Sequence, residues 1–257
     1  MIERVLAPNP GPMTGTGTNT WLVSDAAGQV AVIDPGPDEP AHVEAILAAA
    51  ARHGPIAAVL VTHRHLDHLP AARPVCERSG APLLGHPDLP GVGRGLGDEE
   101  VCFGDLRALH TPGHTTDSVC LFDPRSGALF TGDLVAGAGT VVVDDAPGGL
   151  AQYMASLERL AALGPRTIYP GHGPIVEDAP AKLDEYLRHR RQREQQVLDG
   201  LAHGPASVDA LVARIYTDVA PNLVPMAARN VRAHLDKLAR DGRASPLGGD
   251  RWQLTTA

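Results

Sequence analysis

The sequence predicts a large domain of mixed strands and helices, followed by a small, mostly helical module. Short apolar stretches typical of strands are interleaved with helix-like stretches up to about residue 175. The composition shifts after Pro180, where a long charged helix begins. Two further helices and a hairpin end the chain, a combination typical of a winged helix. We therefore expect an α+β domain at 1–178 and a helical linker with a winged-helix-like module at 179–257.

The large domain begins with a strand, a hairpin and a helix. We expect the hairpin turn at 25–29. Pro40 suits the first turn of a helix and Gly54 suits its end. The glycine-rich stretch 91–97 lacks the Lys-Ser/Thr pair of a phosphate-binding loop, so a surface loop is predicted there. Strands are expected at 2–7, 21–23, 30–33, 56–61, 82–85, 101–103, 106–110, 118–122, 128–131 and 167–169, and helices at 40–53, 69–79 and 150–163.

The C-terminal module is predicted from helical spacing and from one capping residue. Ser207 suits the N-cap of the second helix, and Asp209 suits the positive end of its dipole. Val231, Leu235 and Leu238 supply the apolar face of the third helix. We expect helices at 182–201, 207–216 and 223–240, and a hairpin at 244–254.

The overall composition limits the classes of function. The 257 residues carry a formal net charge of −8, and 4% are aromatic. The acidic charge argues against a general affinity for nucleic acid, and the few aromatic side chains argue against base stacking. Cys76, Cys102 and Cys120 form no CxxC pair, so we expect buried free thiols in a reducing compartment. Without a leader-like or membrane-length apolar run, we expect a cytoplasmic protein that binds no membrane.

One short stretch, Thr62–His68, concentrates side chains that bind metals. Three histidines and an aspartate fall within six residues, directly after the apolar run 56–61. That run predicts a buried strand, whose turn can aim several side chains at one point. Three later residues, His114, Asp133 and His172, each follow a strand and lie beside glycine. A lone histidine is usually structural, but this concentration favours a metal site. The other histidines are expected to be structural or solvated: His42, His53, His86, His110, His189, His203 and His234.

The seven candidate ligands can be divided between two metal ions. Imidazole and carboxylate without thiolate suit zinc, with manganese and iron as alternatives. Open coordination positions would let a water that bridges the ions become a hydroxide nucleophile. Asp67 is also the expected catalytic residue, because it would orient this water, and Asp34 is a candidate partner of the ligands. We expect His63, His65 and His114 at the first ion, Asp67, His68 and His172 at the second, and Asp133 as the bridge.

These motifs resemble those of the metallo-β-lactamase superfamily. Thr62–His68 matches its HxHxDH motif, and His114, Asp133 and His172 match its later motifs in order. The resemblance covers the first 175 residues or so. It implies a four-layer αβ/βα sandwich with a dimetal site at one edge.

Nearly the whole chain resembles one group of that superfamily, the β-lactamase-like protein 2 group. The shared features are Gly17–Thr20, the basic stretch 186–196 and the winged-helix-like module. The group includes a mitochondrial endoribonuclease and fungal acyl-carrier-protein thioesterases. The resemblance therefore implies a hydrolase and leaves its substrate open.

We therefore expect a binuclear metal-dependent hydrolase, in which a metal-bridging hydroxide attacks a thioester, a lactone or a phosphodiester. A small molecule or an acyl compound is the favoured substrate. One alternative is an endoribonuclease that cleaves single-stranded RNA. Another is a persulfide dioxygenase with a single iron, held by the residues His63, His114 and Asp133. A non-catalytic alternative is a metal sensor attached to a DNA-binding winged helix.

Basic side chains near the start of the module have two interpretations. They could meet phosphates, but acidic neighbours favour a solvated helix face with ion pairs. The balanced charge of the module argues against duplex DNA as a partner. It favours a role in packing, in a homodimer or as a lid of the pocket. The arginines are Arg188, Arg190, Arg191 and Arg193, and the acidic neighbours are Asp184, Glu185 and Glu194.

Overall fold

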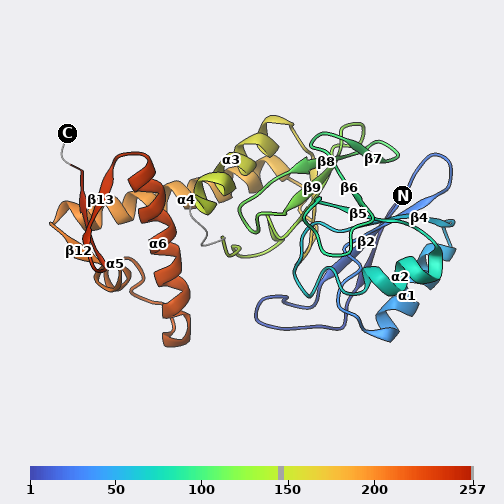
Figure 1. The fold of residues 1–257 in the computed structure, drawn as a ribbon, viewed down its shortest axis with the longest axis horizontal. Coiled ribbons are helices and arrows are strands. Elements are labelled where there is room, and N and C mark those ends of the chain that lie inside the picture. Colours follow the sequence, from blue (N-terminus) through green and yellow to red (C-terminus); the bar gives the residue numbers. More distant parts are fainter. Residues whose placement is uncertain (144–147, 256–257) are drawn as a thin grey trace.

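Two β-sheets lie face to face, and helices cover the outer face of each (Figure 1). The computed structural model describes residues 1–143 and 148–255. The first sheet has the order β1 (Ile2–Leu6), β2 (Asn19–Ser24), β3 (Val30–Ile33), β4 (Ile56–Leu60), β5 (Leu83–Gly85) and β6 (Arg94–Gly95). The second has the order β11 (Thr167–Pro170), β10 (Ala128–Gly132), β9 (Val119–Asp123), β8 (Leu106–His110) and β7 (Val101–Phe103). The predicted four-layer sandwich is confirmed.

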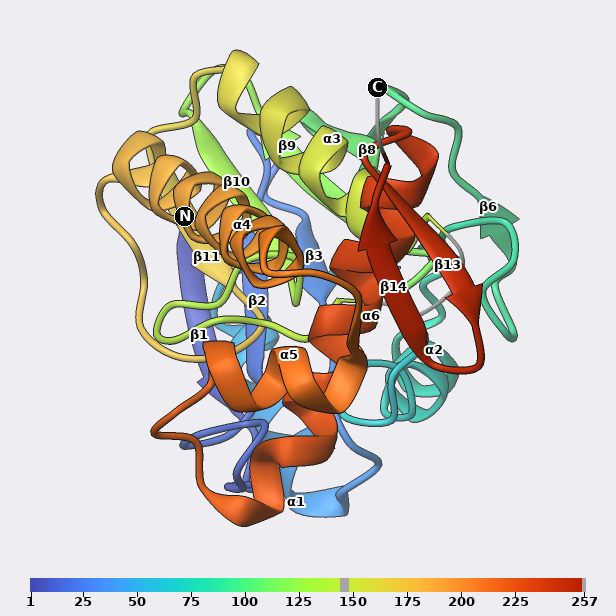
Figure 2. The same ribbon diagram turned by 90° about the vertical axis from the view of Figure 1, so that its left-hand side faces the viewer.

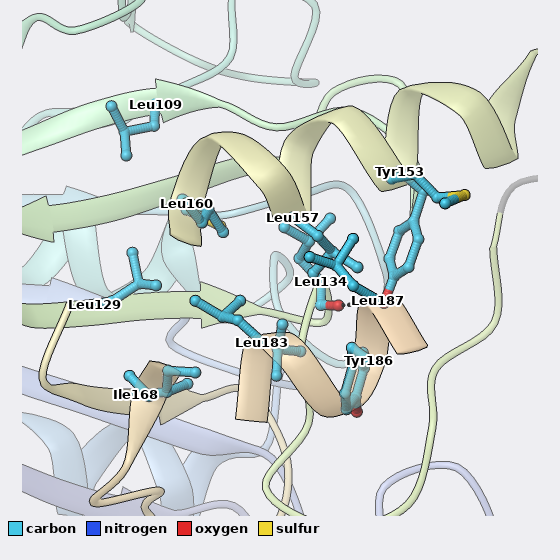
Figure 3. Close-up of a cluster of buried hydrophobic side chains, with 14 of the residues drawn as sticks. Leu109, Leu129, Leu134, Tyr153, Leu157, Leu160, Ile168, Leu183, Tyr186 and Leu187 are labelled. Atoms are coloured by element: carbon cyan, nitrogen blue, oxygen red, sulfur yellow. Dashed lines mark hydrogen bonds between the residues drawn. The ribbon is translucent and has the colours of Figure 1, made fainter. Parts of the chain in front are cut away.

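Three hydrophobic cores separate these four layers. The helices α1 (Pro40–Ala51) and α2 (Ala72–Ser79) cover the first sheet, and α3 (Gly149–Ala162) and α4 (Ala179–Ala202) cover the second. On β4, Val59 enters the core under α1 and α2, whereas Leu60 enters the core between the sheets. Figure 3 shows the third core, where α3 and α4 pack on the second sheet. Because β4 is buried on both faces, its sequence is apolar throughout rather than alternating.

The directions of the strands bring several strand ends to one edge of the molecule. β3, β4 and β5 are parallel, joined by α1 and α2, and β10 and β11 are parallel, joined by α3. β8 runs in the same direction as β10, because both are antiparallel to β9. Loops that leave β4, β8, β10 and β11 can therefore meet, and these loops carry the candidate ligands.

The C-terminal module is a winged helix, as predicted. Its helices are α5 (Val208–Ile215) and α6 (Val224–Arg240), preceded by the short 3-10 helix η1 (Pro221–Leu223). Its sheet has the order β12 (Ala206–Ser207), β14 (Arg251–Leu254) and β13 (Ala244–Gly248). Ser207 caps α5, since its hydroxyl accepts from the N–H of Ala210 at 3.2 Å. Figure 2 shows the module in front of the large domain.

The helix α4 belongs to two cores. Leu183 and Leu187 pack with α3 in the third core of the large domain, whereas Val197 and Leu201 pack in the core of the module. A boundary before residue 179 therefore coincides with the start of a helix that both parts share. Among the helices that the structure describes, none has both the length and the hydropathy of a membrane span.

The structure corrects three local predictions. The helix expected from residue 69 begins at Ala72, because the preceding residues form a turn in which the carbonyl of His65 accepts from the N–H groups of His68 and Leu69. The loop predicted at 91–97 contains β6, which pairs with β5. The short strand β12 was not predicted at all, because its pairing partner β14 lies more than forty residues later in the chain.

The predicted solvated face of arginines is wrong at two positions. Arg188 does pair with Asp184, at 2.7 Å. Arg190, however, is only 2% exposed, and Arg193 stacks on the ring of Tyr216 at 4.4 Å. The helical spacing from Leu183 and Leu187 to position 190 places Arg190 on the apolar face of α4, a signal that the sequence did contain.

His234 on α6 is expected to make folding sensitive to acid. It is buried, and among the described residues neither of its ring nitrogens has a hydrogen-bond partner. Burial, with the charges of Arg190 and Lys237, lowers the pKa of His234 to about 3. The unfolded chain takes up this proton near pH 6.5 and the folded protein does so only near pH 3, so stability falls as pH falls between these values.

From pH 7 to pH 5 this group should cost about 2 kcal/mol of unfolding free energy. His234→Leu should lose that part of the pH dependence, as measured by urea denaturation at each pH. If the wild type and His234→Leu show the same pH dependence, the interpretation is wrong.

Candidate metal centre

The motif Thr62–His68 lies in the turn that leaves β4, and Asp34 at the end of β3 holds this turn. The Asp34 carboxylate accepts from the backbone N–H of Thr62 at 2.7 Å and from its hydroxyl at 2.8 Å. The same carboxylate accepts from Nδ1 of His68 at 2.9 Å. Asp34 thus fixes the ring of His68 and leaves its Nε2 free to face the centre of the site, as expected of a partner of the ligands.

The remaining candidate ligands come from the second sheet. His114 follows β8, Asp133 follows β10 and His172 follows β11. Glycine permits their close approach to the first sheet: a Cβ at Gly171 would lie 2.7 Å from Oδ1 of Asp133. Residue 171 must therefore lack a side chain for the two loops to meet.

A buried asparagine joins the loop of His172 to the first sheet. The side-chain amide of Asn19 donates to the carbonyls of Pro170 and Gly173, each at 2.9 Å. The backbone N–H of Asn19 also donates to the carbonyl of Gly171, at 2.7 Å. Through these hydrogen bonds the stretch Gly17–Thr20 positions the loop that carries His172. In the sequence this stretch stood out only because it resembles the family.

The structure brings all seven candidate ligands together in two groups that share Asp133. Within each group the candidate donor atoms lie within 4.8 Å of one another. The first group consists of His63, His65, His114 and Asp133, and the second of Asp67, His68, Asp133 and His172. None of the other seven histidines, all of which are described, belongs to either group.

The arrangement of donor atoms fits divalent metal ions. Nδ1 of His65 lies 3.0 Å from Nε2 of His63 and 3.1 Å from Nε2 of His114. In the second group, Nε2 of His68 lies 3.3 Å from Nε2 of His172. Oδ1 of Asp133 is buried and lies 3.3 Å from Nε2 of His172 and 3.4 Å from Nε2 of His68. Several nitrogens and one buried carboxylate oxygen therefore converge, which is the donor set of a divalent metal site.

The electrostatics of the two groups differ. Burial lowers the pKa of His63 and His65, so both imidazoles are neutral, the form that binds metals. Burial opposes a charge on His68 as well, but Asp133 and Asp34 outweigh it and hold the pKa of His68 well above its usual value. The pKa of His172 rises to about 9, because contacts with Asp133 and Asp67 overcome its burial. The acidic side chains thus stabilise positive charge in the second group.

His114 is oriented by a contact that no sequence pattern could reveal. Its Nδ1 lies 2.8 Å from the carbonyl oxygen of Val142. A carbonyl only accepts, so Nδ1 carries the hydrogen and Nε2 presents its lone pair to the first group. Val142 contributes through its backbone, so the identity of its side chain could not predict this contact.

A pocket of about 450 Å³ opens beside the two groups. Its lining includes three candidate ligands, His114, Asp133 and His172. The remaining walls come from the loop 12–15, from the segment 136–143 and from the winged helix. A substrate that fills this pocket would therefore reach the candidate ligands.

Two family models match the chain. The model of the metallo-beta-lactamase superfamily matches residues 13–101 and 94–172, and that of the beta-lactamase associated winged helix domain matches residues 207–252. A beta-lactamase-like protein 2 homolog from Drosophila melanogaster is 34% identical, over 94% of this chain and 89% of that protein. An atrochrysone carboxyl ACP thioesterase from Aspergillus fumigatus is 34% identical, over 93% of this chain and 81% of that protein.

A solved structure agrees with these relatives in its fold. A beta-lactamase domain protein from Burkholderia ambifaria matches with a TM-score of 0.83 over 98% of this chain and 91% of that chain, at 22% identity. The likeness extends through both the four-layer domain and the module. The chain therefore belongs to the metallo-beta-lactamase superfamily, as a hydrolase whose catalytic fold continues into a beta-lactamase associated winged helix domain.

Proposed function

We propose that the enzyme is a binuclear hydrolase that cleaves the thioester, or a similar ester bond, of an apolar acyl compound. The observation that carries this proposal is the pair of donor groups that share Asp133 beside a single pocket. The thioesterase named among its relatives supports an ester-like bond. The apolar lining of the pocket by Val141, Val143 and Met226 supports an acyl substrate.

The seven residues have separable roles in this proposal. His63, His65 and His114 would hold one ion, Asp67, His68 and His172 would hold the other, and Asp133 would contact both. When bound, two divalent ions, zinc in our proposal, would acidify a water molecule and polarise the bond to be cleaved.

Asp67 is the ligand best placed to orient the attacking water. Its side chain is 27% exposed, whereas that of His68 is fully buried. It also lines an opening next to the main pocket. One oxygen of Asp67 lies 3.1 Å from Nε2 of His172, so its other oxygen can accept a hydrogen bond from water. A thiolate leaving group is stable near neutral pH, so thioester cleavage needs little help from a general acid.

The alternatives explain fewer of these observations. A dioxygenase with one iron, held by His63, His114 and Asp133, would leave the convergence of Asp67, His68 and His172 without a role. RNA cleavage would favour a basic, aromatic-lined groove, and the net charge of the chain is −8. We also place the enzyme in the cytoplasm, which its three free cysteines support.

Zinc-loaded enzyme should hydrolyse acyl thioesters faster than lactones or single-stranded RNA. Asp67→Ala should lower kcat/KM roughly a hundredfold or more, because the attacking water loses its orientation. Asp184→Ala, on the exposed face of α4, is the matched control and should leave the rate unchanged. Cleavage of RNA alone, or oxygen consumption on a persulfide with one iron per chain, would contradict the proposal.

Asp34→Asn should weaken metal binding by about 10- to 100-fold, because His68 loses the carboxylate that orients its ring. Competition with a chelator, followed by metal counting in a mass spectrometer, measures this change. Asp25→Asn provides the control, since among the described residues the Asp25 carboxylate accepts from Ala27 and Gln29, within a hairpin turn. Unchanged affinity in Asp34→Asn would show that the contact is dispensable.

A further inference from the structure

One wall of the pocket comes from the winged helix rather than from the catalytic fold. Leu223 of η1 and four residues of α6, Met226, Arg229, Asn230 and Ala233, belong to its lining. Spacings of three and four residues place these α6 side chains on one face of the helix. The other face of α6, which includes Val231, is buried in the core of the module. Figure 1 shows this helix facing the loop that precedes β2.

Several side chains of this lining are large and apolar although they are accessible to solvent. Met13 is 62% exposed, and Leu223 and Met226 are each 42% exposed. Val141 and Val143 belong to the same lining. Exposed large apolar side chains that gather around one hollow indicate a binding surface, and methionine adapts to ligands of varied shape.

The module is held against the large domain at a defined position. The carboxylate of Asp236 on α6 accepts from the backbone N–H of Gly148, at the start of α3, at 2.8 Å. Arg240 fixes that carboxylate from the side, at 3.1 Å. Ala233 packs against the third core of the large domain. The wall formed by α6 therefore has a fixed distance from the candidate ligands.

We propose that η1 and α6 form the acyl subsite, so that the winged helix selects substrates with a long apolar acyl chain. The pocket is continuous with His114, Asp133 and His172, so a chain in it would leave the scissile carbonyl at these ligands. A volume of about 450 Å³ suits a ligand of this size. The inference rests on the proposed function and adds to it the residues that set chain length.

Chain-length dependence tests this subsite. Asn230→Trp places a large ring in the pocket, whose lining does not include Asp67, and should lower kcat/KM for a decanoyl thioester at least about tenfold. The rate on an acetyl thioester should stay within about twofold. Leu223→Asn keeps the branched shape of the side chain but replaces its apolar surface with polar surface, and should act in the same direction. Val224→Trp is the matched control, because Val224 is exposed on α6 but outside the lining.

Binding of decanoate, measured by calorimetry, separates the two proposals. If the wild type binds decanoate more tightly than acetate and Asn230→Trp does not, the subsite stands even when no thioester is cleaved. If thioesters are cleaved without dependence on chain length, the proposed function stands and the subsite is wrong. Equal losses on acetyl and decanoyl substrates in Asn230→Trp would also overturn the subsite.

A second inference concerns Arg190, a buried cation on α4. Its Nη2 donates to the carbonyl of Val141 at 2.8 Å, and its guanidinium lies 5.1 Å from the centre of the Tyr153 ring. Among the described residues, its Nε has no hydrogen-bond partner. Burying a cation costs free energy, and packing alone does not offset that cost. A functional role would explain why an arginine occupies this position.

The segment that Arg190 contacts also orients a candidate ligand. Val141 precedes Val142, whose carbonyl accepts from Nδ1 of His114 at 2.8 Å. One turn earlier on α4, the hydroxyl of Tyr186 accepts from the N–H of Ala136 at 3.1 Å and donates to the carbonyl of Gly139 at 3.0 Å. α4 thus holds the segment 136–143 at several points.

We infer that Arg190 is a positioning residue for His114. It holds the carbonyl of Val141, and the next carbonyl along the chain, that of Val142, sets the tautomer and the direction of the His114 ring. Arg190 therefore acts from outside the group of ligands. Contacts of this kind, one step removed from a metal, typically change metal affinity by 10- to 100-fold.

Metal affinity tests this role without an assay of activity. Arg190→Met should release one of two zinc ions at a chelator concentration about 10- to 100-fold lower than the wild type, while the second ion stays bound. Arg188→Met is the control, because Arg188 lies two residues earlier on α4, is exposed, and pairs with Asp184. Circular dichroism shows whether each variant is folded.

Two results would overturn the role of Arg190. One is a folded Arg190→Met that keeps both ions as tightly as the wild type. The other is an equal loss of both ions, which indicates general destabilisation. If Arg190→Met does not fold, Tyr186→Phe tests the inference instead. This variant loosens the segment 136–143 by removing only one hydroxyl. Tyr186→Phe should then weaken the same single ion, and unchanged affinity in it would refute the inference.

Discussion

The candidate metal centre depends on the hydrogen bonds that the carboxylate of Asp34 accepts. It is 1% exposed, and such burial is tolerable because three donors surround it: two from Thr62 and one from His68. These bonds tie the end of β3 to the turn after β4. The loops of the second sheet then close on a turn that is already rigid, so the ligands from both sheets meet at defined distances.

Most of the fold followed from local patterns. Apolar runs, helical spacing and a capping serine located nearly all helices and strands, because each of these signals lies within a few residues. The exceptions have a common cause. The two-residue strands β6 and β12 exist only through pairing with distant strands, and the start of α2 depends on how the turn after His65 closes. Such interactions leave no trace in a short window of sequence.

The candidate ligands were predictable for a different reason. A cluster of histidine and aspartate beside glycine is rare unless it has chemistry to perform, and strand direction explains how residues as distant as His63 and His172 meet. The contacts that orient the ligands were harder to anticipate. Val142 acts through its carbonyl, and Arg190 was assigned to a solvated face because its neighbours are charged. Its position in the apolar spacing of α4 was the better guide.

The sharing of α4 between two cores has a consequence for how the chain is made. Residues 179–187 complete the third core of the large domain, although they follow its last strand, β11. The contact from Arg190 to Val141 comes later still. The third core is therefore incomplete until the first half of α4 has been synthesised. The segment 136–143 gains its contacts with Tyr186 and Arg190 only at that point, although the winged helix has still to be made.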